Sequence, residues 1–211
     1  MSTEPLSLRA AKKQETRQLI SDHATRLFLR EGFEETTIAE IAAAARVSKK
    51  TVTNYFARKE DIALDHHETF TAGLARTVET RADGESALAA LRRAFGTAVR
   101  DRDAVAGFAG PDFSRMIADS PTLTTRLREL HDQRERVLAD ALAAATAAGP
   151  DDITPRAAAA QLAAAHRLLF SRIQELTLAG RDGDRIAAIL DTEAARVFDR
   201  LEPGLGDYAV R

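Results

Sequence analysis

Apolar residues recur every three or four positions along most of the chain, which is the periodicity of amphipathic helices. Early in the sequence, one such segment ends at Gly32, and its core positions are Leu19, Ile20, Ala24, Leu27 and Phe28. Near the end, the same spacing joins Ile186, Ile189, Leu190, Val197, Phe198 and Leu201 ahead of Pro203-Gly204. No segment shows a convincing alternation of apolar and polar residues, which would predict a strand. The sequence therefore predicts an all-α fold of about nine helices.

Start and stop signals divide the rest of the chain into helices. Acidic residues favour the first turn of a helix, so Glu60 and Asp61 predict a long fourth helix from Lys59 to about Arg81. Proline suits the first helical position, and glycine often follows the last one. These rules place the later helices after Ser86, through Phe113 to Ile117, from Pro121 to about Ala148, from Pro155 to about Leu178, and from about Asp184 to Leu201.

Two short helical patterns, joined by a tight turn, lie between residues 37 and 61. Thr37 can cap the first helix while Glu40 reaches back to it, which is a capping box. Ser48 is a second N-cap residue, and Val52 and Phe56 follow it at helical spacing on one side. The pattern is typical of a helix-turn-helix.

The other sides of the second short helix carry cations, hydroxyl groups and an amide. Lysine can donate to guanine, asparagine can pair with adenine, and threonine offers a hydroxyl and a methyl group to thymine. A solvated face of an ordinary helical domain would also fit any one of these residues. Together with the tight turn, they favour a recognition helix for a DNA major groove.

The segment from Gln14 to Leu64 resembles the N-terminal domain of the tetracycline-repressor (TetR) family of bacterial regulators. The family signature runs from a threonine-capped helix to a Tyr/His-Phe-x-x-Lys-Glu-Asp segment, which here begins at Tyr55. The resemblance implies that Thr37, Tyr55 and Lys59 meet DNA phosphates, and that Lys49, Lys50, Thr51, Thr53 and Asn54 face the bases. Arg46 is also a candidate DNA contact, although the family usually has glycine there. It must either avoid positive φ or carry strain. Arg58 replaces a small residue, which loses a cap and adds a cation.

The resemblance also implies that the chain is divided into regions with different functions. Residues 1–9 would form a disordered arm, residues 10–58 the helix-turn-helix domain, and residues 59–211 a helical bundle for effector binding and dimerisation. We expect a homodimer through the last two helices, whose alanine-rich faces allow close approach. Packing of these two helices within one subunit is the alternative. A dimer would let two short recognition helices read an inverted-repeat operator in double-stranded DNA.

Composition and charge narrow the classes of function. The 211 residues are 45% hydrophobic and 29% charged, with a formal net charge of −2. Residues 1–59 contain 11 Lys and Arg against 7 Asp and Glu, whereas the remainder contains 19 against 25. The basic part therefore coincides with the helix-turn-helix.

Other features of the composition exclude several kinds of site. The absence of cysteine excludes disulfides and thiolate chemistry. Adjacent histidines such as His66 and His67 point about 100° apart on a helix, so we predict no metal site and no cofactor. No apolar run is long enough to span a bilayer, and there is no signal segment. We expect a cytoplasmic protein with no membrane partner.

The effector region is less informative than the DNA-binding region. Candidate residues that line a cavity are Phe95, Phe108, Phe113, Met116 and Phe170, with His131, His166 and Arg167 as polar anchors. Each of them can equally be a core or surface residue. Gly107, Gly110 and Pro111 mark either a flexible entrance or an ordinary helix break. The effector is an unknown small molecule.

Three functions fit the sequence. The first is a repressor that a small-molecule effector releases from its operator. The second is an activator, or a regulator that needs no effector. The third is an enzyme or carrier that contains a helix-turn-helix, and no catalytic triad, phosphate-binding loop or metal motif supports it. The sequence therefore favours a DNA-binding transcriptional regulator without enzymatic activity.

Overall fold

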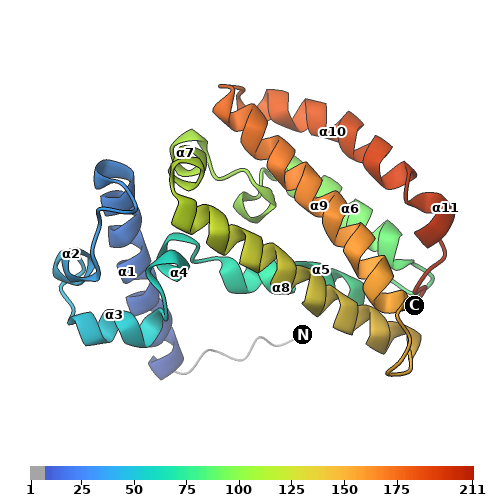
Figure 1. The fold of residues 1–211 in the computed structure, drawn as a ribbon, viewed down its shortest axis with the longest axis horizontal. Coiled ribbons are helices and arrows are strands. Elements are labelled where there is room, and N and C mark those ends of the chain that lie inside the picture. Colours follow the sequence, from blue (N-terminus) through green and yellow to red (C-terminus); the bar gives the residue numbers. More distant parts are fainter. Residues whose placement is uncertain (1–7) are drawn as a thin grey trace. The chain divides into compact units, whose positions relative to one another are not determined.

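The computed structural model describes residues 8–211, which contain eleven α-helices, one short 3-10 helix and no strand (Figure 1). The predicted all-α class is confirmed. The helices are α1 (Leu8–Glu31), α2 (Ile38–Ala44), α3 (Lys49–Tyr55), α4 (Lys59–Ala63), α5 (His67–Glu79), α6 (Ala87–Arg100), η1 (Ala104–Ala106), α7 (Pro111–Asp119), α8 (Pro121–Thr146), α9 (Thr154–Leu178), α10 (Gly183–Asp199) and α11 (Glu202–Leu205). The arm predicted for residues 1–9 lies largely outside the described residues.

The prediction of a continuous fourth helix is wrong. Helix α4 ends after one turn, because Leu64 leaves the helical conformation with φ −106° and ψ 51°. The two halves of the predicted helix pack into different hydrophobic cores. Helix α4 packs against α1, whereas α5 packs against α6. Neither glycine nor proline marks the break, so the sequence pattern runs through it unchanged.

Apart from the split of the predicted fourth helix, one further helix that was not expected lies near the C-terminus. Pro203 and Gly204 were expected to end the helical part of the chain. Instead, both belong to α11, and Pro203 occupies its first turn, where its missing N–H costs no hydrogen bond. The expected nine helices become eleven through this helix and the split between α4 and α5.

The chain forms two compact units. The first contains residues up to Asp65 together with Met116–Thr124. In it, α1 packs against α2 and α4, and α2 packs against α3. Its core is made of buried side chains from all four helices: Ile20, Ala24, Phe28, Ile41, Val52, Phe56 and Ile62. The three helices of the predicted helix-turn-helix domain therefore share one core, although the functional boundary predicted at residue 58 stays a prediction.

The second unit contains residues His66–Arg115 and Thr125–Arg211. Helix α10 packs against α6 and α9, and α6 also contacts α5, η1 and α11 (Figure 1). One hydrophobic cluster runs through these helices, from Leu74 on α5 to Phe198 on α10. Within residues 8–211, no helix is long and apolar enough to cross a membrane.

Candidate nucleic-acid interface and internal cavity

Side-chain caps fix the start of both short helices. The Glu40 N–H donates to Thr37 Oγ1 at 3.3 Å, and the Thr37 N–H donates to Glu40 Oε2 at 2.8 Å, which confirms the capping box. Ser48 Oγ accepts a hydrogen bond from the Thr51 N–H at 3.0 Å. These bonds satisfy backbone donors that the first turn of a helix leaves without partners.

The turn between α2 and α3 depends on an arginine in the left-handed region. Arg46 has φ 55°, and the next residue, Val47, donates its N–H to the Ala42 carbonyl at 2.9 Å. The structure thus decides between the two alternatives, because Arg46 adopts the positive φ that favours glycine. This conformation costs an ordinary residue about 1–2 kcal/mol. The Arg46 side chain is exposed.

Helix α3 has one buried side and one exposed side. Val52 is fully buried, and Phe56 follows it into the same core. The exposed side chains share one face, because they include pairs that lie three or four residues apart: Lys49, Lys50, Thr53 and Asn54. Thr51 and Tyr55 flank this face and are half-buried. We name these six residues the α3 face.

Hydrogen bonds within the first unit hold parts of the α3 face. Thr51 Oγ1 lies 2.8 Å from Ser48 Oγ, and Thr53 Oγ1 donates to the Lys50 carbonyl at 3.1 Å. The Tyr55 carbonyl accepts a hydrogen bond from Arg17 at 3.0 Å, and the Arg17 guanidinium lies 4.4 Å from the centre of the Phe56 ring. Helix α1 thereby holds the C-terminal end of α3 in place.

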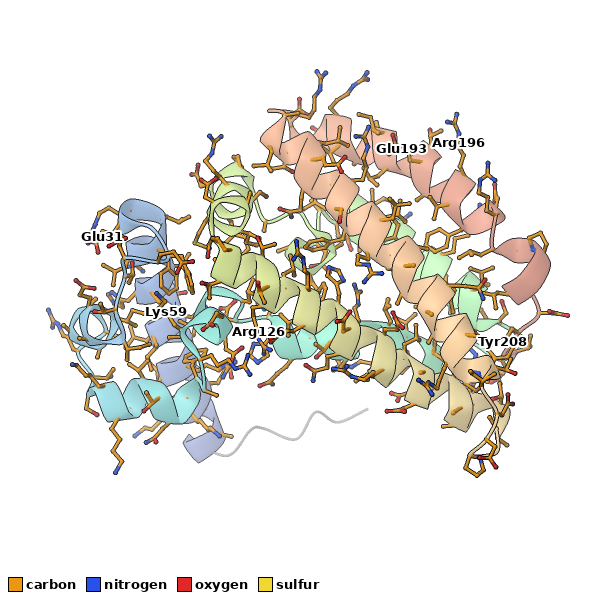
Figure 2. All side chains as sticks on the ribbon, in the orientation of Figure 1. Glu31, Lys59, Arg126, Glu193, Arg196 and Tyr208 are labelled. Carbon is orange, nitrogen blue, oxygen red and sulfur yellow. The ribbon has the colours of Figure 1, made fainter. Side chains whose placement is uncertain are left out.

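Lys59 has a structural role that its position in the sequence does not indicate. Its Nζ donates to the carbonyls of Phe33, Glu34 and Thr36 at 2.8, 3.2 and 3.0 Å (Figure 2). It also lies 4.3 Å from the centre of the Phe33 ring. An ammonium group has three donors, and all three are used here. Lys59 therefore holds the loop that leads to Thr37, and its predicted phosphate contact stays a prediction.

The carboxylate of Glu34 ties a second segment to the same loop. Glu34 accepts hydrogen bonds from the hydroxyl groups of Ser120 and Thr122, at 2.5 and 3.2 Å. The Ser120 bond is the main reason that the pKa of Glu34 is lowered. Ser120 Oγ also accepts the Leu123 N–H at 3.1 Å, which caps the start of α8. The loop before α2 is thus fixed by Lys59 and by the start of α8.

The second unit contains a cavity of about 180 Å³. Its lining residues are Thr69, Gly73, Leu74, Thr77, Leu91, Ala94, Phe95, Ala98, Asp103, Val105, Ala106, Arg134, His166 and Phe170. Three of the predicted cavity residues belong to it: Phe95, His166 and Phe170. The structure brings them together from α6 and α9.

The other five candidates do not line this cavity. His131 is buried edge-on against Phe170, with ring centres 5.4 Å apart. Phe108 packs partly buried against the core, and Phe113 is half-buried on α7. Met116 belongs to the first unit, and Arg167 is exposed, 3.9 Å from Asp132 Oδ1.

Arg134 is a lining residue that sequence reasoning missed. Its guanidinium lies 4.5 Å from the centre of the Phe70 ring, and its buried Nε has no hydrogen-bond partner. Burial lowers its pKa to about 10, so it remains a cation at neutral pH. Helix α8 carries several arginines, and spacing alone does not show which of them turns inward.

The two buried histidines are held neutral. Burial, and then the charges of Arg134 and Arg167, lower the pKa of His131 to about 4. Burial, and then Arg134, lower the pKa of His166 to about 3. Residues 8–211 contain no cluster of three or more side chains suited to a metal ion.

Comparison with known proteins gives one match to the helix-turn-helix segment and one to most of the chain. The sequence model of bacterial regulatory proteins of the tetR family matches residues 20–65. The HTH-type transcriptional regulator TcmR of Streptomyces glaucescens is 32% identical over 155 residues, which cover 71% of this chain and 69% of that protein. The helix-turn-helix and the helical second unit thus define a DNA-binding transcriptional regulator, not an enzyme.

The chain belongs to the TetR family of bacterial regulators. Solved structures share its fold at lower identity. A TetR-family regulator of Streptomyces coelicolor has a TM-score of 0.52 at 20% identity and covers 94% of this chain and 99% of its own. NalD of Pseudomonas aeruginosa has a TM-score of 0.51 at 19% identity and covers 89% of this chain and 97% of its own.

Replacing Lys59 by methionine should lower the free energy of unfolding by roughly 1–3 kcal/mol, because three carbonyls lose a charged donor while the apolar stem remains. Lys49→Met is the matched control and should change stability by less than about 0.5 kcal/mol, because the side chain is exposed. Urea unfolding followed by circular dichroism measures both values. Equal stability of the two variants would contradict the structural role of Lys59.

Acidification should destabilise the second unit. Each buried histidine has a lower pKa in the folded protein than its ordinary 6.5, so the unfolded chain binds more protons below pH 6.5, and stability falls as pH falls. Between pH 7 and pH 5, each histidine should remove roughly 2 kcal/mol. His131→Phe should lose correspondingly less stability over this interval in urea titrations. An unchanged pH dependence in that variant would refute the assignment.

Proposed function

We propose that the protein is a repressor that binds an inverted-repeat operator as a homodimer and dissociates when a small molecule enters the cavity. The α3 face is the observation that carries the DNA-binding part. Lys49, Lys50 and Asn54 project from a helix whose other side is anchored by Val52. Lysine and asparagine match the acceptors and donors of guanine and adenine in a major groove.

Contacts to phosphates complete the proposed interface. Thr37 lies at the N-terminus of α2, where exposed backbone donors and the helix dipole favour anions. Arg46, Thr51, Thr53 and Tyr55 belong to the same proposed surface, with Lys59 positioning the loop beneath it. All five lysines of the chain lie between residues 12 and 59, which concentrates flexible cations in the unit that holds α3.

The outer side of α9 supports the proposed dimer. Leu168 is 59% exposed, and Leu178 is exposed at the end of the same helix. Small exposed alanines, Ala157 and Ala164, continue the same side. A second copy of α9 and α10 would bury this stripe, and the small residues would permit close approach of the helices. One recognition helix contacts only a few base pairs, so pairing also increases specificity.

Helix α8 offers a route from the cavity to the α3 face. Its first residues belong to the first unit, next to the hydrogen bond between Ser120 and Glu34. Further along, the same helix carries Arg134 into the cavity lining. A ligand that changes the preferred position of α8 would act on the loop that precedes Thr37. Such couplings are typically 1–3 kcal/mol, or about 5- to 150-fold in affinity.

Selection of bound duplexes from a random library should return two inverted half-sites whose centres lie roughly 34–36 Å apart along the helix axis. Lys50→Ala should change the preferred base at specific positions, at a cost of roughly 1–3 kcal/mol if the contact is bidentate. The exposed Arg100, in the second unit, supplies the control variant Arg100→Ala, which should select the wild-type sequence.

The dimer has its own test within that experiment. Leu168→Glu should sediment as a monomer and should lose the paired site, because the charge falls on the stripe that the partner covers. Leu29→Glu, at an exposed position on α1, should remain dimeric. A wild-type monomer that selects single half-sites would contradict the proposal.

A further inference from the structure

Two residues that line the cavity each carry a buried polar atom without a hydrogen-bond partner. Arg134 Nε and His166 Nε2 are both buried, and neither makes a hydrogen bond in the structure. Both residues line the cavity. A buried donor or acceptor without a partner costs roughly 1–3 kcal/mol, and more when the group is charged. Two such groups beside one cavity point to a ligand atom that satisfies them.

The charge of Arg134 lacks a carboxylate partner. No ion pair among the described residues includes Arg134. Its guanidinium instead lies over the face of the Phe70 ring. Asp103 also lines the cavity, but its side chain is exposed, and its Oδ1 accepts the Val105 N–H at 2.9 Å. The cavity is therefore electropositive at its buried side.

The other walls are apolar and aromatic. Phe95 and Phe170 face the cavity with Leu74 and Leu91. The His166 ring is fixed between two phenylalanines, with centres 5.7 Å from Phe95 and 5.5 Å from Phe198. These edge-on contacts orient the imidazole, so Nε2 has a defined position. Burial lowers the pKa of His166 to about 3, which keeps the ring neutral at physiological pH.

The size of the cavity limits the ligand. An apolar protein cavity of about 150 Å³ is known to hold benzene, and this cavity measures about 180 Å³. Its volume therefore matches one aromatic ring with a small substituent. A larger molecule would extend out of the cavity through its open side. Gly107, next to the lining residue Ala106, packs so closely on Ile173 that an added Cβ would lie 3.3 Å away, which limits movement on that side.

We propose that the cavity binds a one-ring aromatic molecule that carries an anionic oxygen, either a carboxylate or a phenolate. The anionic oxygen accepts hydrogen bonds from Arg134 Nε–H and from His166 in its neutral Nε2–H tautomer. The ring packs against Phe95 and Phe170. This inference rests on the proposed function, because it names the chemical class of the effector that the same cavity receives.

The test compares benzoate with benzamide, which has the same shape without the charge, by titration calorimetry on the full chain. Wild-type protein should bind benzoate at least about tenfold more tightly than benzamide, because a charged hydrogen bond is worth roughly 1.5–3 kcal/mol. Phenolate-bearing probes such as 4-nitrophenol separate the two sources of the anionic oxygen. Equal affinity for benzoate and benzamide, or no benzoate binding, would overturn the proposal.

Arg134→Met removes the charge and keeps an apolar side chain of similar length. It should abolish the preference for benzoate without lowering the melting temperature, because a buried charge without a carboxylate partner contributes little to stability. Arg136→Met, at an exposed position on the same helix, should behave like wild type. Retained benzoate preference in Arg134→Met would refute the site.

A second variant covers the case in which Arg134→Met fails to fold. Ala94→Leu fills part of the cavity from α6 and leaves both polar groups in place. It should weaken benzoate and benzamide together, since it acts by volume. Unchanged affinity for both probes would place them outside this cavity and overturn the proposal.

Parallel measurements of operator affinity distinguish failure of the proposed ligand class from failure of the proposed release by an effector. If benzoate binds with the expected preference but leaves operator affinity unchanged, the site stands and release by an effector fails. If the protein binds an inverted repeat but shows no benzoate preference, only the assignment of the ligand class fails.

Discussion

Helix α3 has seven residues, and an isolated helix shorter than about 12–15 residues is marginal in water. Its conformation therefore depends on burial of Val52 and Phe56 and on the Ser48 cap. The turn before it even holds Arg46 at positive φ. The exposed face of α3 can carry lysines and asparagine only because the first unit supplies the stability that α3 lacks.

The loop between α1 and α2 collects the interactions that fix α2 and α3. Lys59 donates hydrogen bonds to three backbone carbonyls of this loop, and Glu34 joins the loop to the start of α8. The break at Leu64 removes the long fourth helix as a rigid connection. Helix α8 is continuous from Pro121 to Thr146, and Arg134 lies part of the way along it.

The sequence predicted the features that depend on local chemistry. The caps at Thr37 and Ser48, the buried side of α3 and most helix limits follow from residue type and spacing. It did not predict features that depend on distant contacts. The role of Lys59 requires residues 33–36 to fold back onto it, and the inward orientation of Arg134 requires the packing of α5, α6 and α9. The cavity residues Phe95, His166 and Phe170 are aromatic positions of α6 and α9 that face inward, whereas Phe108 lies in a loop and Arg167 is exposed. Residue type alone does not separate these two groups.

Lysine modification tests directly whether the α3 face binds the operator, because all five lysines lie between residues 12 and 59. Reductive methylation of the full protein, read by mass spectrometry, gives the rate at each lysine with operator DNA and with a scrambled duplex. The operator should slow modification of Lys49 and Lys50, whereas Lys59 should react slowly under both conditions because its three donors are used. Equal rates at Lys49 and Lys50 with either duplex would contradict the claim that the α3 face binds the operator.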